Sequence, residues 1–114
     1  MPDSDLLQTL VTELRRGSLT LATLSYLKTP HYGYALLQSL QGKGIEIEAN
    51  TLYPLLRRLE GQGLLTSDWD TAESRPRKYY TLSEAGKTIC GQLKSEWEMM
   101  QTSLQRLMEE EVDG

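Results

Sequence analysis

The sequence predicts a mainly α-helical fold that contains one small β-hairpin. Apolar residues recur at helical spacing through most of the first 62 residues, two β-rich segments joined by a polar stretch follow, and a long helical pattern ends the chain. Short helices around a small core, followed directly by a hairpin, form a winged helix-turn-helix. We therefore expect a winged-helix domain with an N-terminal helix over residues 1–86, a C-terminal dimerisation helix over 87–110 and a disordered tail over 111–114.

The distribution of charge leaves binding to nucleic acid open, although the chain has a net charge of −4. Residues 1–82 carry nine basic and nine acidic side chains and are neutral. The whole acidic excess lies from residue 83 onward, where three basic and seven acidic side chains occur. A local basic patch in the first 82 residues therefore matters more than the total charge.

Three features predict a soluble cytoplasmic protein without membrane contact. No apolar run approaches the roughly 20 residues that span a bilayer. The acidic start, residues 1–5, lacks the basic segment that opens a signal peptide. Cys90 is the single cysteine, so no intrachain disulfide can form, which fits a reducing compartment.

The first 30 residues hold two apolar stripes at helical spacing. The first runs from Leu6 to Leu14, Gly17 and Ser18 interrupt it, and the second runs from Leu19 to Leu27 before Pro30. A single glycine costs a helix only about 1 kcal/mol. Two helices and one bent helix are therefore both compatible with this pattern.

The next segment is predicted to be a turn, a helix and an extended piece. Residues 31–33, His-Tyr-Gly, are typical of a turn, and the following helix carries Leu36, Leu37 and Leu40 before glycines end it. Residues 45–48 alternate apolar and charged side chains, which indicates a short strand or an extended segment.

A strong amphipathic helix is predicted from about Asn50 to Gln62. Its buried face consists of leucines at i, i+3, i+4 and i+7, namely Leu52, Leu55, Leu56 and Leu59. The opposite face presents Asn50, Pro54, Arg57 and Gly61, flanked by Tyr53 and Arg58. A major groove admits one helix, and Arg and Asn side chains pair bidentately with guanine and adenine edges. This helix is therefore the predicted DNA-reading element.

The same polar residues also have structural interpretations. Asn50 is a good helix N-cap, and this role is compatible with a base contact besides. If Asn50 caps the helix, Pro54 removes the first intrahelical bond, and the true start of the helix is then shifted. Arg57 and Arg58 are also compatible with a solvated helix face.

A β-hairpin with a long mobile loop is predicted after this helix. Residues 64–69 and 78–82 are the strands, and the polar segment 70–77 joins them. Tyr79 and Tyr80 must point to opposite faces, with one of them in the core. Gly63 stands where a left-handed C-terminal cap is expected, and Ser83 where the N-cap of the last helix is expected.

The hairpin loop carries a basic cluster made of Arg75, Arg77 and Lys78. A flexible basic loop is suited to contacts with phosphates or the minor groove. The alternative is a charged turn that only keeps the edge of the hairpin soluble.

Two segments resemble the PadR family of bacterial transcription regulators: TLYPLLRRLE at 51–60, followed by GLL at 63–65, and RKYYTLSEAG at 77–86. The shorter segments YGYAL at 32–36 and RGSL at 16–19 are similar to other parts of its winged helix. The resemblance runs from about residue 14 to 107. It implies a dimeric repressor of the smaller subfamily, with a single C-terminal dimerisation helix, that binds near-palindromic operators. Some members of the family release DNA when a small molecule binds.

The residues that we expect to contact duplex DNA come from the helix, the hairpin and the segment before the second helical element. They are Tyr32, Tyr34, Asn50, Thr51, Tyr53, Pro54, Arg57, Arg58, Arg75, Arg77, Lys78 and Tyr80.

The last helix carries a heptad seam that predicts a homodimer. Its members are spaced 3, 4, 3, 4 and 3 residues apart, and they are Cys90, Leu93, Trp97, Met100, Leu104 and Leu107. A seam of this length is too short to be stable as an isolated pair, so it should also pack on the core, with the first helix as a candidate partner. The alternative is a helix that packs only on its own domain.

Trp97 and Met100 are also candidates for an effector site at the dimer interface. The resemblance includes members in which an equivalent tryptophan lines a cavity between subunits, where flat aromatic ligands stack. Met99 and Met100 would give such a site an adaptable wall for an apolar or aromatic ligand. The alternative is a dry interface in which Trp97 is packing.

The sequence argues against an enzyme and implies no cofactor and no metal. His31 is the single histidine, and no phosphate-binding loop, metal-ligand cluster or nucleophile motif occurs. The main alternative to a DNA-binding regulator is a protein-interaction module with the same winged-helix fold.

Overall fold

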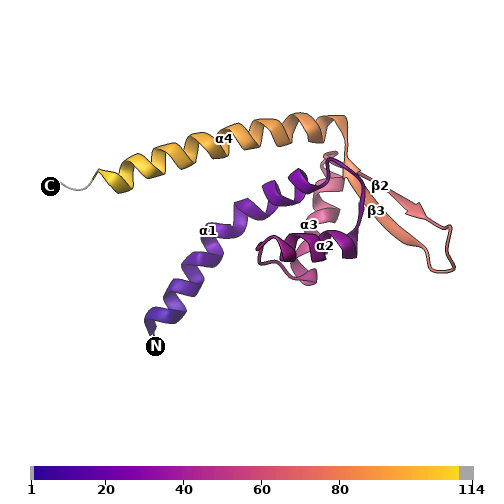
Figure 1. Cartoon of the computed structure of the whole chain (residues 1–114), viewed down its shortest axis with the longest axis horizontal. Helices are drawn as coiled ribbons and strands as arrows, with labels where there is room; N and C mark the ends of the chain where they lie inside the picture. The colour runs from indigo at the N-terminus through magenta and orange to yellow at the C-terminus, as the bar shows by residue number, and fades with distance from the viewer. Residues whose placement is uncertain (1, 111–114) are drawn as a thin grey trace.

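The computed structural model describes residues 2–110 and shows four helices and a small sheet among them (Figure 1). In chain order the elements are α1 (Pro2–Tyr26), β1 (His31–Tyr32), α2 (Gly33–Gly42), α3 (Ala49–Gly61), β2 (Leu65–Asp70), β3 (Arg77–Leu82) and α4 (Glu84–Glu109). This order is the winged-helix arrangement that the sequence predicts. The tail predicted at 111–114 lies outside the described residues.

The first element is one continuous helix rather than two. Helix α1 passes through Gly17 without interruption, and open space surrounds that residue. Leu27 closes the last turn by donating to the carbonyl of Leu24 at 3.1 Å. Helix α1 ends at Tyr26, and Pro30 disfavours helical geometry at the residue before it.

The prediction of a turn at residues 31–33 is wrong. His31 and Tyr32 form β1, which pairs antiparallel with β3 so that His31 lies opposite Tyr80. Strand β3 is therefore the central strand in the order β1-β3-β2. For residues 45–48 the sequence allowed a short strand or an extended segment. The structure shows the extended segment, since these residues lie in no strand, and Ile47 is buried.

The start of α3 differs from the expected one. The helix begins at Ala49 with Glu48 as the cap residue, and no side chain caps it. Asn50 lies inside the first turn, so its interpretation as the N-cap is wrong. Pro54 then lies inside the helix, where it donates no bond to the carbonyl of Asn50.

The end of α3 follows the prediction. Gly63 has a φ of +81°, in the left-handed region that favours glycine. Its amide donates to the carbonyl of Glu60, and the amide of Leu64 donates to the carbonyl of Leu59, both at 3.0 Å. These two bonds form a Schellman motif that turns the chain from α3 into β2.

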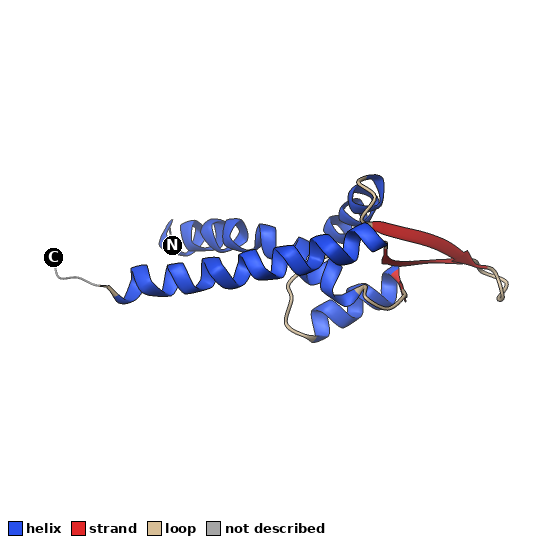
Figure 2. Ribbon diagram, turned by 90° about the horizontal axis from the view of Figure 1, so that it is seen from above, coloured by secondary structure: helices blue, strands red, loops and turns tan. Residues whose placement is uncertain are grey.

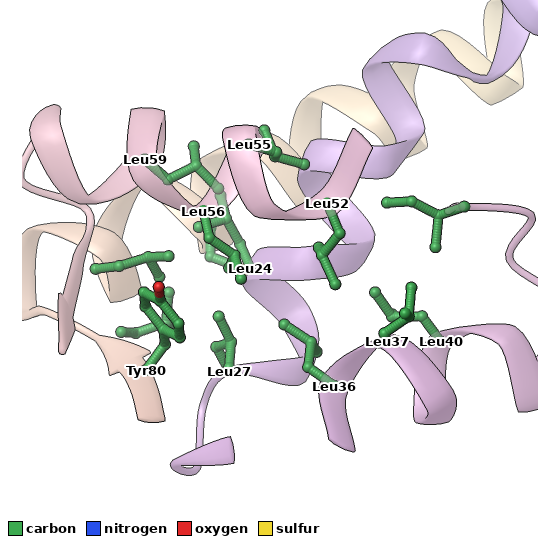
Figure 3. Close-up of a cluster of buried hydrophobic side chains, with 14 residues drawn as sticks. Leu24, Leu27, Leu36, Leu37, Leu40, Leu52, Leu55, Leu56, Leu59 and Tyr80 are labelled. Carbon is green, nitrogen blue, oxygen red and sulfur yellow. The ribbon is translucent and has the colours of Figure 1, made fainter. Parts of the chain in front are cut away.

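A leucine core joins the helices to the sheet (Figure 3). Its most deeply buried side chains are Leu24, Leu27, Leu36, Leu52, Leu56 and Leu59. Burial of each such side chain contributes about 1.5–3 kcal/mol relative to exposure. Tyr80 joins this core with 6% exposure while Tyr79 lies on the other face of β3, as the strand geometry predicts.

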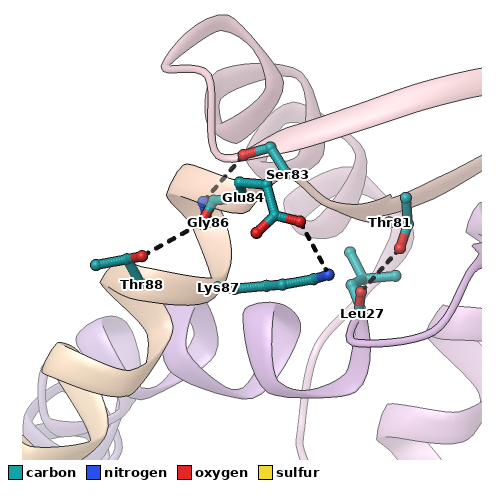
Figure 4. A network of polar contacts seen from close by, with 7 residues as sticks. All are labelled: Leu27, Thr81, Ser83, Glu84, Gly86, Lys87 and Thr88. Atoms are coloured by element: carbon teal, nitrogen blue, oxygen red, sulfur yellow. Dashed lines mark hydrogen bonds and ion pairs between the residues drawn. The ribbon is translucent and has the colours of Figure 1, made fainter.

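The junction between the hairpin and α4 is held by hydrogen bonds from the side chain and the backbone of Ser83, of which Figure 4 shows the one between its hydroxyl and Gly86. The Ser83 hydroxyl donates to the carbonyl of Gly63 at 2.6 Å and accepts from the amide of Gly86 at 2.9 Å, which confirms its predicted role as N-cap. Its own amide donates to the carbonyl of Leu64 at 3.0 Å. The carbonyl of Leu27 accepts from the neighbouring Leu82 amide at 2.9 Å.

The molecule is elongated, with extents of 64 × 37 × 23 Å. Helices α1 and α4 run from the core to the end of the molecule opposite the hairpin (Figures 1 and 2). Within residues 2–110, none of the helices is long and apolar enough to cross a bilayer.

Gly86 provides a sharp test of the junction. A Cβ at this position would lie 2.0 Å from the carbonyl oxygen of Leu64, which is backbone and cannot move aside cheaply. We expect Gly86→Ala to lower the free energy of unfolding by about 1–3 kcal/mol or more in urea denaturation followed by circular dichroism. Gly91→Ala is the matched control, since open space surrounds Gly91 in the same helix. It should stabilise by about 0.5–1 kcal/mol. Equal midpoints for the two variants at equal protein concentration would contradict this account.

Candidate nucleic-acid interface

The outward face of α3 presents the side chains that the helical wheel predicts. Asn50, Thr51, Pro54, Arg57 and Arg58 are all exposed, opposite the buried leucines. Among residues 2–110, no ion pair engages either arginine. This face can therefore offer two free guanidinium groups and an amide to a groove of DNA.

Tyr53 has a packing role that its position on the helix did not reveal. It is partly buried against the core, and its ring lies over the start of α2, where a Cβ on Gly33 would come within 2.8 Å of the Tyr53 Cε1 atom. Gly33 thus allows α2 and α3 to approach closely. Tyr53 holds these two helices together and leaves only part of its ring for a ligand.

The two tyrosines before and within α2 differ in environment. Tyr34 is exposed at 63%. Tyr32 precedes α2 and is half-buried, and its hydroxyl donates to the Oδ2 atom of Asp70 at the end of β2. The guanidinium of Arg77 lies 4.2 Å from the centre of the Tyr32 ring, and Tyr79 meets the same ring edge-on.

The two residues that flank the hairpin loop, Asp70 and Arg77, are therefore held against Tyr32 of β1. The strands reach Asp70 and Arg77, so the loop itself is 71–76 and shorter than the predicted segment 70–77. Asp70 also accepts the Ala72 amide at 3.0 Å, and Arg77 pairs with Glu73 at 3.4 Å. Two expected DNA contacts, Tyr32 and Arg77, already have partners within the chain.

These contacts shift two acid–base equilibria. The hydroxyl of Tyr32, followed by the Ala72 amide, stabilises the ionised carboxylate and lowers the pKa of Asp70 below its ordinary value. The same hydrogen bond to Asp70 raises the pKa of the Tyr32 phenol. At neutral pH the pair consists of a neutral phenol and a charged carboxylate.

The other face of the hairpin packs against the end of α3. Lys78 is paired with Glu60, with 3.6 Å between the Nζ and Oε1 atoms, and Ser67 donates a hydrogen bond to the other oxygen of Glu60. Trp69 lies opposite Lys78 in the hairpin register and is 58% exposed. From the sequence, neither Glu60 nor Trp69 was identified as a neighbour of Lys78. The register of the hairpin could have placed Trp69 beside Lys78, but no local pattern in the sequence indicates the role of Glu60.

One expected contact is excluded by burial. Tyr80 was expected to touch DNA, but its side chain belongs to the core that β3 shares with the helices. Arg75, by contrast, is exposed on the loop and has no ion-pair partner among residues 2–110. Together with Arg57 and Arg58, it supplies the positive charge of α3 and the hairpin that has no ion-pair partner among residues 2–110.

Comparison with known proteins identifies the family. The profile of the Transcriptional regulator PadR-like family matches residues 21–92, which include the core, α3, the hairpin and the start of α4. The chain belongs to the PadR-like family of transcriptional regulators. Proteins of this family are regulators and not enzymes.

Known relatives agree with this membership. A PadR family transcriptional regulator from Eggerthella lenta DSM 2243 is 47% identical, with a TM-score of 0.91 over 97% of this chain and 99% of that one. A PadR-like transcriptional regulator from Bacillus cereus is 25% identical, with a TM-score of 0.77 over 87% of this chain and 99% of that one. The transcriptional regulator Rv3488 from Mycobacterium tuberculosis is 39% identical over 49% of this chain, and the matched region spans 52% of its length.

Helix α4 of this PadR-like chain divides into a packed start and an exposed remainder. Cys90 is buried, and its Sγ atom lies 3.8 Å from the Ser25 hydroxyl of α1. Its assignment to the dimer seam is therefore wrong, because it belongs to the core of the single chain. The remaining seam residues are exposed: Leu93, Trp97, Met100, Leu104 and Leu107. The predicted packing of this seam on the first helix does not occur within one chain, since Leu6, Leu7, Leu10 and Leu14 of α1 are exposed too.

The Tyr32–Asp70 contact gives a measurable pH dependence. Tyr32→Phe removes the largest cause of the shift, so the pKa of Asp70 should rise towards its ordinary value in a carboxyl-carbon NMR titration. Because the pKa of Asp70 is lower in the folded protein than in the unfolded chain, the contact stabilises at neutral pH, and the contribution is lost as the pH falls through the folded-state pKa. Tyr34→Phe is the control, and an Asp70 titration that is identical in the two variants would refute the assignment.

Proposed function

We propose that this PadR-like regulator is a repressor that binds a near-palindromic DNA operator as a homodimer. The observation that carries the proposal is the exposed face of α3, which presents the Asn50 amide beside Arg57 and Arg58, two arginines without an ion-pair partner among the described residues. This face and Arg75 of the wing lie in a chain whose net charge is negative. The family resemblance favours repression over activation.

In this proposal the helix and the wing have different tasks. Helix α3 enters the major groove, where Arg57 and Asn50 contact base edges. Arg75 contacts phosphate from the loop and carries no sequence information. Tyr32 and Arg77 position the loop through Asp70, while Tyr34, Thr51 and Pro54 border the groove-facing surface.

Substitution of single arginines tests the division of tasks. Arg57→Ala should cost about 1–3 kcal/mol on a duplex selected by the protein from a random library, and much less on a scrambled duplex of the same composition. Arg75→Ala should weaken both complexes equally and reduce the slope of log K against log salt by about 0.9. Fluorescence anisotropy over a salt series measures both quantities.

Arg106→Ala, in the last turn of α4, is the control for loss of an exposed arginine. Equal losses on both duplexes would exclude base reading by Arg57. A wild-type protein without a salt-sensitive, sequence-specific complex would support the protein-interaction module instead.

The homodimer is proposed to form through the exposed apolar faces of α1 and α4. Leu10 and Leu14 on α1 and Trp97 and Leu104 on α4 expose apolar surface. Both helices run towards the end of the molecule opposite the hairpin (Figure 1). A second copy can cover both faces at once. Such a dimer would set the spacing of two recognition helices, which must lie about one DNA turn, roughly 34 Å, apart.

A charge placed in the seam tests the dimer. Leu104→Lys should give a monomer in analytical ultracentrifugation, because a lysine in the seam leaves an unpaired charge when the seam is buried. Loss of the dimer should lower the affinity for the operator, while the helix content of the protein stays the same. Thr102→Lys adds the same charge on the opposite side of α4, where it should leave the dimer intact. A dimeric Leu104→Lys protein would refute this interface.

An effector site at Trp97 and Met100 stays a prediction that depends on the dimer. In the single chain these side chains are 43% and 58% exposed, so an enclosed site requires the second subunit. An apolar or aromatic ligand would release DNA only if it bound two dimer geometries with different affinity.

A further inference from the structure

The carboxylate of Glu60 joins the recognition helix to the wing. Glu60 lies in the last turn of α3, and its two oxygens face the hairpin. One accepts the hydroxyl of Ser67 in β2, and the other lies 3.6 Å from the ammonium of Lys78 in β3. A single side chain thus contacts both strands of the wing.

The position of Glu60 on its helix is electrostatically unfavourable without these partners. The C-terminal end of a helix carries partial negative charge, which disfavours a carboxylate in the last turn. Ser67 and Lys78 offset this cost, since one donates a hydrogen bond and the other supplies a positive charge. The arrangement therefore makes the attachment of the wing depend on an acidic residue at the end of the DNA-reading helix.

The same pairing reduces the positive charge that the wing offers to DNA. Glu60 is the only carboxylate within 4.0 Å of the Lys78 ammonium among residues 2–110. Both side chains keep about a third of their surface exposed, at 32% for Lys78 and 33% for Glu60. The ammonium is therefore accessible, yet its charge is partly neutralised by a residue next to the DNA-reading face.

We propose that Glu60 is a positioning residue that supports sequence specificity by holding the wing on α3 through Ser67, and that it limits the overall affinity for DNA by masking the charge of Lys78 against phosphate contact. This inference rests on the proposed DNA-binding function. A masked lysine lowers the affinity for every duplex by the same factor, so masking leaves the ratio of specific to non-specific affinity unchanged, and discrimination depends on the base contacts of α3 and the position of the wing.

Glu60→Gln separates the two roles, because the amide oxygen still accepts from Ser67 while the charge is lost. We expect this variant to bind the selected and the scrambled duplex more tightly by the same factor, with a salt slope steeper by about 0.9, the value for one added phosphate contact. Glu84→Gln is the matched control, since Glu84 is an exposed carboxylate 3.3 Å from Lys87 at the start of α4. It should leave the slope unchanged.

A double-mutant cycle identifies Lys78 as the group that Glu60 masks. The gain from Glu60→Gln should disappear in the Glu60→Gln/Lys78→Ala protein. A gain that persists without Lys78 would show direct repulsion between Glu60 and phosphate and would overturn the masking. A Glu60→Gln protein that behaves like Glu84→Gln would overturn it as well.

Ser67→Ala tests the attachment of the wing without changing any charge. It should reduce the ratio of selected-duplex to scrambled-duplex affinity and leave the salt slope unchanged, because the wing is then less firmly placed relative to α3. An unchanged ratio would overturn the positioning role. Ser95→Ala is the control for loss of an exposed serine hydroxyl, since Ser95 lies on α4.

Retention on immobilised heparin distinguishes failure of this inference from failure of the proposed function. Heparin is a polyanion without base sequence, so it reports the unmasked charge of Lys78 even if the wild type binds no specific duplex. Glu60→Gln should elute at higher salt than Glu84→Gln. Equal elution would overturn the masking whether or not the protein binds an operator.

Discussion

The close approach of α4 to the turn after α3 is the constraint on which the layout of the molecule depends. At Gly86 the helix backbone comes so near the carbonyl of Leu64 that only a hydrogen fits on the Cα atom. Ser83 bonds the same turn, because its amide donates to the carbonyl of Leu64 and its hydroxyl donates to the carbonyl of Gly63. This contact determines where α4 leaves the domain, and hence how far its apolar surface lies from α3.

Compensation of charge is the second organising feature. Acidic side chains from α3, β2 and the wing loop lie beside most of the basic groups of the hairpin: Glu60 with Lys78, Glu73 with Arg77, and Asp70 near the same arginine. Within α3 and the hairpin, positive charge without an ion-pair partner among residues 2–110 is thereby confined to Arg57, Arg58 and Arg75. In a protein of negative net charge, positive groups restricted to a few positions favour contact with DNA at a defined set of side chains over general electrostatic attraction to DNA.

Prediction succeeded where the signal was local. The leucine spacing of α3, the caps at Gly63 and Ser83, and the alternation at Tyr79 and Tyr80 all follow from the geometry of one element. It failed where a distant element decided the outcome. Strand β1 forms only because its two residues pair with the edge of β3. Cys90 does not belong to the predicted seam because it packs against Ser25 of α1.

The sequence by itself determined the class of fold, the face of α3 that points outward and the amphipathic character of α4, because each is encoded in a period of about 3.6 or 2 residues. Only the tertiary structure decided the partners of the polar groups. Tyr32 meets Asp70 across 38 positions of the chain, and Glu60 meets Lys78 across the whole of β2 and the wing loop. Such pairs arise from the way the elements pack on the leucine core, and no spacing along the chain specifies them.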